Sequence, residues 1–323
     1  MHIPDGFLSA RVAGAAAVLS AVGVGMAVRN TRARFPQRKI PLMGLSAAFI
    51  FAAQMLNFPV AGGTSGHMVG GVLAAVLLGP SAAILVLTSV LIVQCFVFAD
   101  GGILALGANI FNMGIISSVG GFFLYEAVRR MMPGERGKLV AVAFSAWCAT
   151  VLAAIVCAGE LALSGTVRWP VAFAAMANVH MLIGIGEAII TTLVVFAVSQ
   201  TRPDLVDDGA VESARSFGRA DFVGYGVLIA IGMAAFIGPF ACPWPDGLDR
   251  VAEKLGFSGH EAARRLIGSP IPNYHLPGIS SASVATALAG VVGTVVAFGL
   301  GLFLARTLVP PSVKTGQAEQ AKA

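Results

Sequence analysis

Residues 82–98, AAILVLTSVLIVQCFVF, form a charge-free apolar run that decides the fold class of this chain. A helix needs roughly 20 consecutive apolar residues to cross a lipid bilayer, and its backbone groups must be hydrogen-bonded within the segment. The run therefore predicts a transmembrane helix. Eight more apolar stretches follow this pattern, of which only the short 68–79 stretch is expected to pack against neighbours rather than span: 12–28, 40–57, 68–79, 104–127, 139–161, 171–198, 222–240 and 284–305.

The composition agrees with a membrane protein. Of the 323 residues, 57% are apolar and 11% are charged, whereas a soluble domain has roughly 25% charged residues. We predict an all-α polytopic membrane protein with nine spans at most: a seven-span bundle, then a two-span module with a long extracytoplasmic loop. The sequence contains no G-x-x-x-x-G-K-[ST] motif, so it lacks a Walker A loop with which to energise transport by its own ATP hydrolysis.

Basic residues predict the orientation. They follow the first, fifth, seventh and ninth predicted spans: Arg29, Arg32, Arg34, Arg38, Lys39, Arg129, Arg130, Arg136, Lys138, Arg202, Arg215, Arg219 and Arg306. Because Lys and Arg are enriched in cytoplasmic loops, we expect an extracytoplasmic N-terminus and a cytoplasmic C-terminus in the plasma (inner) membrane. These juxtamembrane bases account for the pI of 9.3, which therefore indicates no nucleic-acid partner.

The chain divides into four predicted parts. Residues 1–200 form the bundle, 201–221 a polar cytoplasmic linker, 222–306 a smaller module and 307–323 a polar cytoplasmic tail. Inside the long outer loop of the module, residues 248–267 have a short helical pattern.

Residues 1–6, MHIPDG, can chelate a metal ion. The Met1 amine and the His2 amide nitrogen close a five-membered ring on a metal, and the same amide with His2 Nδ1 closes a six-membered ring. Three nitrogens then lie in one plane. Pro4 has no backbone N–H, so the chelate stops after one amide and leaves a fourth in-plane position for a ligand from elsewhere.

Residues 57–67, NFPVAGGTSGH, bring a second histidine to the same predicted side. Three glycines permit tight or left-handed backbone, so this loop can dip into the bundle and deliver His67 beside His2. An isolated histidine at a span boundary is usually a satisfied interfacial residue, but two on one face favour a shared nitrogen site. A planar set of four nitrogens suits Ni²⁺ or Cu²⁺, and Co²⁺ less strictly.

Other polar side chains lie within or next to the predicted spans. Gln94, Asp100, Asn109 and Asn112 cluster at the outer ends of the fourth and fifth spans, where they either hold the N-terminal segment or an imidazole N–H or simply join helices. His180 and Glu187 share one face of the seventh span. This pair can relay protons, bind metal or serve only to pack helices.

Together these motifs resemble the CbiM/NikM family, the substrate-binding membrane components of energy-coupling-factor importers for cobalt and nickel. The resemblance covers residues 1–200 and rests on MHIPDG at 1–6, GGTSGH at 62–67, DGG at 100–102 with Asn109 and Asn112, and HMLIGIGE at 180–187. Residues 245–249, PDGLD, and 269–274, SPIPNY, resemble the PDGLE module of NikN-like subunits, with Asp249 in place of the usual Glu. The whole chain resembles a NikM–NikN fusion.

The resemblance implies a metal held by the Met1 amine, the His2 amide, the His2 imidazole and His67. It also implies two partners besides the lipid bilayer: a coupling membrane subunit of the CbiQ/NikQ type and a cytoplasmic ATPase of the CbiO/NikO type. Ni²⁺ or Co²⁺ is then the transported ligand rather than a cofactor, and the chain is a transport subunit with no catalytic residues. The PDGLE-like ending points to nickel more than to cobalt.

Two other functions are compatible with parts of the sequence. A self-sufficient secondary transporter for divalent metals would also use interrupted helices, such as the region around Gly79 and Pro80, but few acidic residues lie at mid-membrane depth. An intramembrane metalloenzyme could use His180 and Glu187, but no nucleophile or third ligand is evident near them. His260 and Glu261 begin an H-E-x-x-H pattern that fails because position 264 is Arg.

Overall fold

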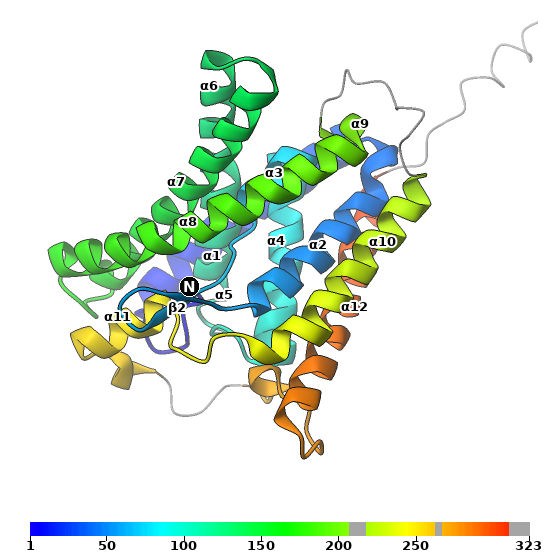
Figure 1. Cartoon of the computed structure of the whole chain (residues 1–323). Coiled ribbons are helices and arrows are strands. Elements are labelled where there is room, and N and C mark those ends of the chain that lie inside the picture. The colour runs from blue at the N-terminus through cyan, green and yellow to red at the C-terminus, as the bar shows by residue number, and fades with distance from the viewer. Residues whose placement is uncertain (207–217, 262–266, 310–323) are drawn as a thin grey trace, which may run out of the picture.

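The computed structural model describes residues 1–206, 218–261 and 267–309, and helices dominate these ranges (Figure 1). Within them the only strands are β1 (Phe58–Val60) and β2 (Thr64–Gly66), which pair as an antiparallel hairpin. Seven helices in these ranges are long and apolar enough to cross a membrane. The predicted all-α polytopic membrane fold is confirmed.

Three of the seven long helices contain π-helical turns, which often occur at functional sites. The seven are α1 (Ala10–Arg34); α4 (Pro80–Val93) continued by the π turn η2 (Gln94–Phe98); α5 (Leu106–Asn109), η3 (Ile110–Gly120, π) and α6 (Gly121–Met131); α7 (Gly134–Leu163); α8 (Trp169–Thr201); α10 (Arg219–Gly232), η4 (Met233–Ile237, π) and η5 (Gly238–Phe240); and α12 (Ala282–Leu308). Short helices connect them: η1 (Gln37–Lys39), α9 (Pro203–Val206), α11 (Gly247–Leu255), η6 (Ser258–His260) and η7 (Pro272–Tyr274).

The predicted spans at 40–57 and 68–79 form helices shorter than a bilayer requires. α2 (Ile40–Met55) has 16 residues and α3 (Gly71–Leu78) has eight. The described ranges thus contain seven full-length spanning helices where at most nine were predicted, and the 68–79 stretch packs against neighbours as expected. Gly70 and Gly79 flank α3 with a φ of 85° at each, a left-handed backbone that glycine adopts readily and that ends the helix. Every residue of α3 is buried, so neighbouring helices rather than lipid surround it.

The last two long helices pack directly on α2 instead of forming a separate unit. A Cβ added at Gly44 of α2 would lie 3.1 Å from the Leu302 Cβ of α12, and one at Gly226 of α10 would lie 2.7 Å from the Leu45 side chain. Small residues permit such close helix contacts in lipid. The predicted C-terminal module therefore shares a core with the bundle. Most of the predicted linker 201–221 and tail 307–323 lies outside the described residues.

The long loop between α10 and α12 lies against the bundle. The Cys242 N–H donates to the Asn57 carbonyl at 2.8 Å, and the Ile271 N–H donates to the Val97 carbonyl at 3.0 Å. Between these ties, α11 packs on α8 and β2. It ends at Leu255, because Gly256 has a φ of 77° and forms a left-handed cap. In the predicted helical pattern of 248–267, residues 248–255 are α-helical and Ser258–His260 form a 3-10 turn, while residues 262–266 lie outside the described ranges.

Candidate metal centre

The N-terminal segment, residues 1–9, folds into the bundle. Gly6 turns the chain with a φ of 98°, and Ser9 caps α1 by accepting a hydrogen bond from the Val12 N–H. The first three residues are buried, with 4% of Met1 and none of Ile3 exposed. The terminal amine therefore lies inside the protein, next to β2 and α11 (Figure 1).

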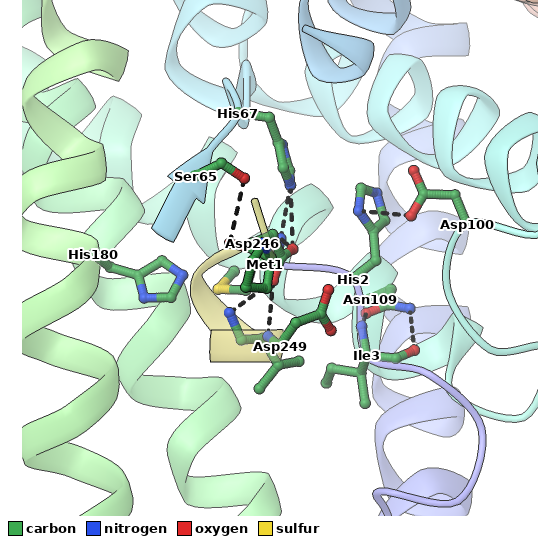
Figure 2. A network of polar contacts seen from close by, with 12 residues as sticks. Met1, His2, Ile3, Ser65, His67, Asp100, Asn109, His180, Asp246 and Asp249 are labelled. Atoms are coloured by element: carbon green, nitrogen blue, oxygen red, sulfur yellow. Dashed lines mark hydrogen bonds and ion pairs between the residues drawn. The ribbon is translucent and has the colours of Figure 1, made fainter. Parts of the chain in front are cut away.

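Asn109 holds the segment by its backbone. Its Oδ1 accepts from the Ile3 N–H at 2.8 Å, and its Nδ2 donates to the Ile3 carbonyl at 3.1 Å (Figure 2). The Gly102 N–H donates to the same carbonyl at 2.9 Å. Asp5 adds a third anchor, because its carboxylate accepts from the N–H groups of Ile103 and Leu104 at 3.1 and 2.8 Å. The segment is thus fixed at Ile3 and at Asp5, on either side of Pro4.

His2 lies between two polar residues of the region 94–100. Its Nε2 is 3.1 Å from Gln94 Oε1, and its Nδ1 is 3.2 Å from Asp100 Oδ1. Asp100 also accepts a hydrogen bond of 2.6 Å from the Tyr274 hydroxyl. Burial lowers the pKa of His2, and the nearby terminal ammonium adds to this effect against the opposing charge of Asp100. The imidazole is therefore neutral at pH 7.

His67 presents a ring nitrogen to the terminal amine. The distance from the Met1 amine to His67 Nε2 is 2.7 Å. The other ring nitrogen, Nδ1, lies 3.0 Å from the Met68 carbonyl. Because a carbonyl can only accept, Nδ1 carries the proton and Nε2 keeps its lone pair. Burial and the neighbouring ammonium lower the pKa of His67 to about 3. The rings of His2 and His67 stack with their centroids 5.1 Å apart.

Glu187 of α8 fixes the backbone just after His67. Its carboxylate accepts from the N–H groups of Val69 and Gly70 at 2.5 and 2.9 Å. On the other side of His67, Gly66 packs so tightly on α8 that an added Cβ would lie 2.7 Å from the Ile183 side chain. These contacts explain why the hairpin needs glycine here and why His67 has a defined position.

Asp246, which the sequence analysis did not select, is the third group at the amine. Its Oδ2 lies 2.6 Å from the Met1 nitrogen and 3.9 Å from His67 Nε2 (Figure 2). Although burial opposes ionisation, the terminal ammonium and His67 lower the pKa of Asp246 below its ordinary value. The sequence feature that could have identified Asp246 is the Pro-Asp-Gly turn before a helical pattern, in a loop predicted on the same side as the N-terminus.

The remaining predicted residues contact other parts of the structure. His180 hydrogen-bonds through Nδ1 to the Met176 carbonyl at 2.8 Å, and its Nε2 is buried without a partner. It lines a small cavity with Met1, Gly66, His67 and Gly247. Asn112 donates to Glu160 at 2.6 Å rather than to the N-terminal segment. His180 and Glu187 therefore flank the His67 segment at separate points, and no hydrogen bond joins them.

The described residues contain no cluster of three or more His, Cys, Asp or Glu side chains placed to hold a metal ion. Around the N-terminus, a backbone or terminal group can add to the side-chain donors. The Met1 amine supplies one, 2.7 Å from a histidine lone pair. Two nitrogens bound at a right angle to a metal about 2.0 Å away are about 2.8 Å apart, so this pair already has the spacing of adjacent ligands.

Two family models match the chain. The model of CbiM, the cobalt uptake substrate-specific transmembrane region, matches residues 2–205. The PDGLE domain matches residues 220–309. The two matches together include the seven long helices except Arg219, the first residue of α10, and they include His2, His67 and Asp246 but not Met1.

Similar proteins and structures agree with these matches. A putative fused nickel transport protein NikMN of Archaeoglobus fulgidus is 36% identical over 95% of this chain and 98% of its own length. A cobalt transport protein CbiM of Geobacter sulfurreducens is 29% identical over 79% of this chain and 77% of its own. The crystal structure of a truncated transition metal transporter, 34% identical, covers 62% of this chain and 99% of that one with a TM-score of 0.57.

Proposed function

The chain belongs to the CbiM family of cobalt uptake substrate-specific transmembrane proteins and carries a PDGLE domain, and on this premise we propose that it is the substrate-binding subunit of an energy-coupling-factor importer for Ni²⁺ or Co²⁺. Its relatives are named as metal transport proteins, not as enzymes. The metal is its transported substrate, captured outside by the Met1 amine, His2 and His67 and released to the cytoplasm.

The observation that carries the proposal is the buried pair of Met1 and His67. The tautomer of His67 leaves Nε2 free to bind a metal, as its Nδ1 hydrogen bonds to the Met68 carbonyl. Fixing the second nitrogen of a histidine in this way is the usual means of orienting a metal ligand. The Met1 amine, 2.7 Å away, needs only to lose a proton to become the adjacent donor.

His2 completes the planar set in this proposal. Gln94 Oε1 accepts from Nε2–H, which leaves the lone pair on Nδ1, as chelation requires. That lone pair lies 3.2 Å from the Asp100 carboxylate, an arrangement that favours a cation nearby. To close the chelate, the His2 ring turns so that Nδ1 leaves Asp100 and joins the amide and amine nitrogens.

Nickel suits such a site better than cobalt. A planar nitrogen set matches the geometric preference of Ni²⁺, and the similar Archaeoglobus protein is named as a nickel transporter. Copper has a higher intrinsic affinity for nitrogen donors, so metal availability must contribute to selectivity in cells.

The proposed importer has further subunits. This sequence has no Walker A motif, so a cytoplasmic ATPase of the CbiO/NikO type and a coupling membrane subunit of the CbiQ/NikQ type would supply energy. We propose that residues 1–6 and the 241–281 loop lie outside and that the C-terminus lies inside, because the basic residues gather at the opposite helix ends from the amine.

An N-terminal extension tests the proposal directly. One alanine retained before Met1 converts the amine into a peptide nitrogen, and we expect Ni²⁺ binding by the purified full-length protein to fall at least about a hundredfold. We expect circular dichroism to show that the protein stays helical, with a lower melting temperature because Asp246 loses its buried ammonium partner. The control is the same residue added after Ala323. Mass spectrometry verifies both termini. Unchanged Ni²⁺ affinity in the extended protein contradicts capture by the amine.

Transport by the isolated chain would contradict the need for partners. In liposomes that contain only this protein, we expect no Ni²⁺ uptake under a proton gradient. Uptake there would identify a self-sufficient secondary transporter, whereas uptake only after addition of the ATPase and coupling subunits supports an ATP-driven importer.

A further inference from the structure

Asp246 is the residue through which the PDGLE domain contacts the proposed metal site. Its Oδ2 is 2.6 Å from the Met1 nitrogen, which is itself 2.7 Å from His67 Nε2. The separation between Oδ2 and Nε2 is 3.9 Å. Donors around one metal ion are about 2.8 to 4 Å apart when each bond is about 2.0 Å long. The Met1 nitrogen thus has about the spacing of a neighbouring donor from both atoms, and Oδ2 must move about 1 Å closer to Nε2 to bind above the plane of the four nitrogens.

The carboxylate is held at this point by its own domain. Its Oδ1 caps α11 by accepting from the N–H groups of Leu248 and Asp249 at 2.8 and 3.0 Å. Oδ1 is thus engaged in the cap, and Oδ2 points to the amine. The side chain is only 14% exposed, so protein rather than water surrounds most of it.

The backbone before Asp246 is attached to the strand that precedes His67. The Ser65 N–H donates to the Pro245 carbonyl at 2.9 Å, and the Ser65 hydroxyl donates to the Trp244 carbonyl at 2.7 Å. After Asp246, an added Cβ on Gly247 would lie 2.8 Å from His180 Cε1. The turn is therefore locked between β2 and α8, with Asp246 and His67 on the same fixed frame.

The charge balance of the proposed site favours a carboxylate beside the bound metal ion. In the proposed set the amine and the imidazoles are neutral and the deprotonated His2 amide carries one negative charge, so a divalent ion leaves a net charge of +1. An uncompensated buried charge is strongly unfavourable. An ammonium has no lone pair for a metal, so in the metal-bound site the metal ion replaces the ammonium as the cation beside Asp246.

We propose that Asp246 Oδ2 is a metal donor, so that the PDGLE domain completes a site shared between both parts of the chain. This inference rests on the proposed function. It assigns a metal donor to residues 222–306, whereas the ligands implied by the sequence all lie in residues 1–67.

The test compares three full-length variants with the wild type. Asp246→Asn keeps the shape and the helix cap, since Asn is as good an N-cap as Asp, but removes the charged donor. Asp249→Asn removes a neighbouring carboxylate from the same helix and is the matched control. His67→Ala tests the proposed function separately. The measurements are Ni²⁺ affinity by competition titration and the ligand-field absorption of the protein loaded with Co²⁺.

For Asp246→Asn we expect Ni²⁺ affinity to fall at least about tenfold and the Co²⁺ spectrum to change, with Asp249→Asn unaffected in both. A weaker affinity with an unchanged spectrum overturns the donor role, because it means that Asp246 acts only at a distance. Wild-type values in Asp246→Asn also overturn it. If His67→Ala binds Ni²⁺ like the wild type, the proposed function itself fails.

Discussion

The two parts of the chain hold the centre in different ways. In residues 1–206, side chains fix the backbone beside each proposed ligand: Asn109 holds Ile3, and Glu187 holds Val69 and Gly70. In residues 218–309, one carboxylate reaches the centre from the cap of a nine-residue helix. The first arrangement is built into the core, whereas the second depends on a few surface-loop contacts. Changes in the first part should therefore have larger effects.

Asn109→Ala should have the largest effect among these anchors. It removes two buried hydrogen bonds to Ile3, and each unsatisfied buried group costs about 1–3 kcal/mol. We expect Ni²⁺ affinity to fall about ten- to a hundredfold, because the terminal segment is released. The control is Asn112→Ala on the same helix, whose side chain contacts Glu160 instead. Equal losses in both variants would mean that helix packing, not the anchor, is responsible.

Glu187→Gln should weaken binding less. Glutamine offers one acceptor oxygen where the carboxylate offers two, so one N–H of Val69 or Gly70 loses its partner. We expect about a tenfold loss of Ni²⁺ affinity with the fold retained. Glu160→Gln on α7 is the control, since Glu160 is also a buried acid but contacts Asn112. Wild-type binding in Glu187→Gln would show that the segment after His67 needs no anchor from α8.

The sequence predicted the fold well where hydrophobicity alone decides it. The apolar runs located all seven long helices, since length and apolarity identify a span. They could not distinguish α2 from a span, because an apolar segment surrounded by protein looks the same as one surrounded by lipid. The short 68–79 stretch was expected to pack against neighbours, and α3 is buried along its whole length. Gly79 and Pro80 indicated the interruption after it, where Gly79 has a φ of 85°.

For the site, the sequence identified groups that lie close together in the structure but not how they pair. His2, His67, Gln94, Asp100 and Asn109 lie around the buried terminus as a set. The contact of Asp246 with Met1 spans 245 positions, and no local pattern encodes a pairing of that range. Asn112 lies three residues after Asn109 but contacts Glu160. This spacing places two side chains on one face of an α-helix, but Asn112 lies in the π-helical segment η3, where that spacing no longer holds.

Acid should destabilise the metal-free protein through His67. Burial lowers its pKa to about 3, against about 6.5 in an unfolded chain. As pH falls below about 6.5 the unfolded state takes up the proton first, so stability falls between about pH 6.5 and 3. We expect a lower melting temperature at pH 5 than at pH 7.5, and a smaller difference in His67→Gln. An equal difference in both proteins assigns the effect to other groups.

Ser65→Ala tests how firmly the second part is attached. The hydroxyl donates to the Trp244 carbonyl at 2.7 Å, while the Ser65 N–H still holds Pro245. With one of these contacts left, we expect Ni²⁺ affinity to fall only about two- to fivefold. Ser145→Ala, a buried serine that bonds within α7, is the control. A loss as large as that of Asn109→Ala would mean that both parts hold the centre equally.

His180→Ala should have the smallest effect on binding, although His180 is the third histidine near the amine. Its Nε2 has no hydrogen-bond partner and its Nδ1 only contacts its own helix, so no proposed ligand depends on it. Removing the ring enlarges a cavity beside Met1 and His67, which should lower the melting temperature while Ni²⁺ affinity stays within about twofold. The measurements are a thermal melt and a competition titration on the same preparation, with His67→Ala alongside. If His180→Ala loses binding as completely as His67→Ala, then His180 is itself a ligand, and the centre extends to α8 rather than to the PDGLE domain alone.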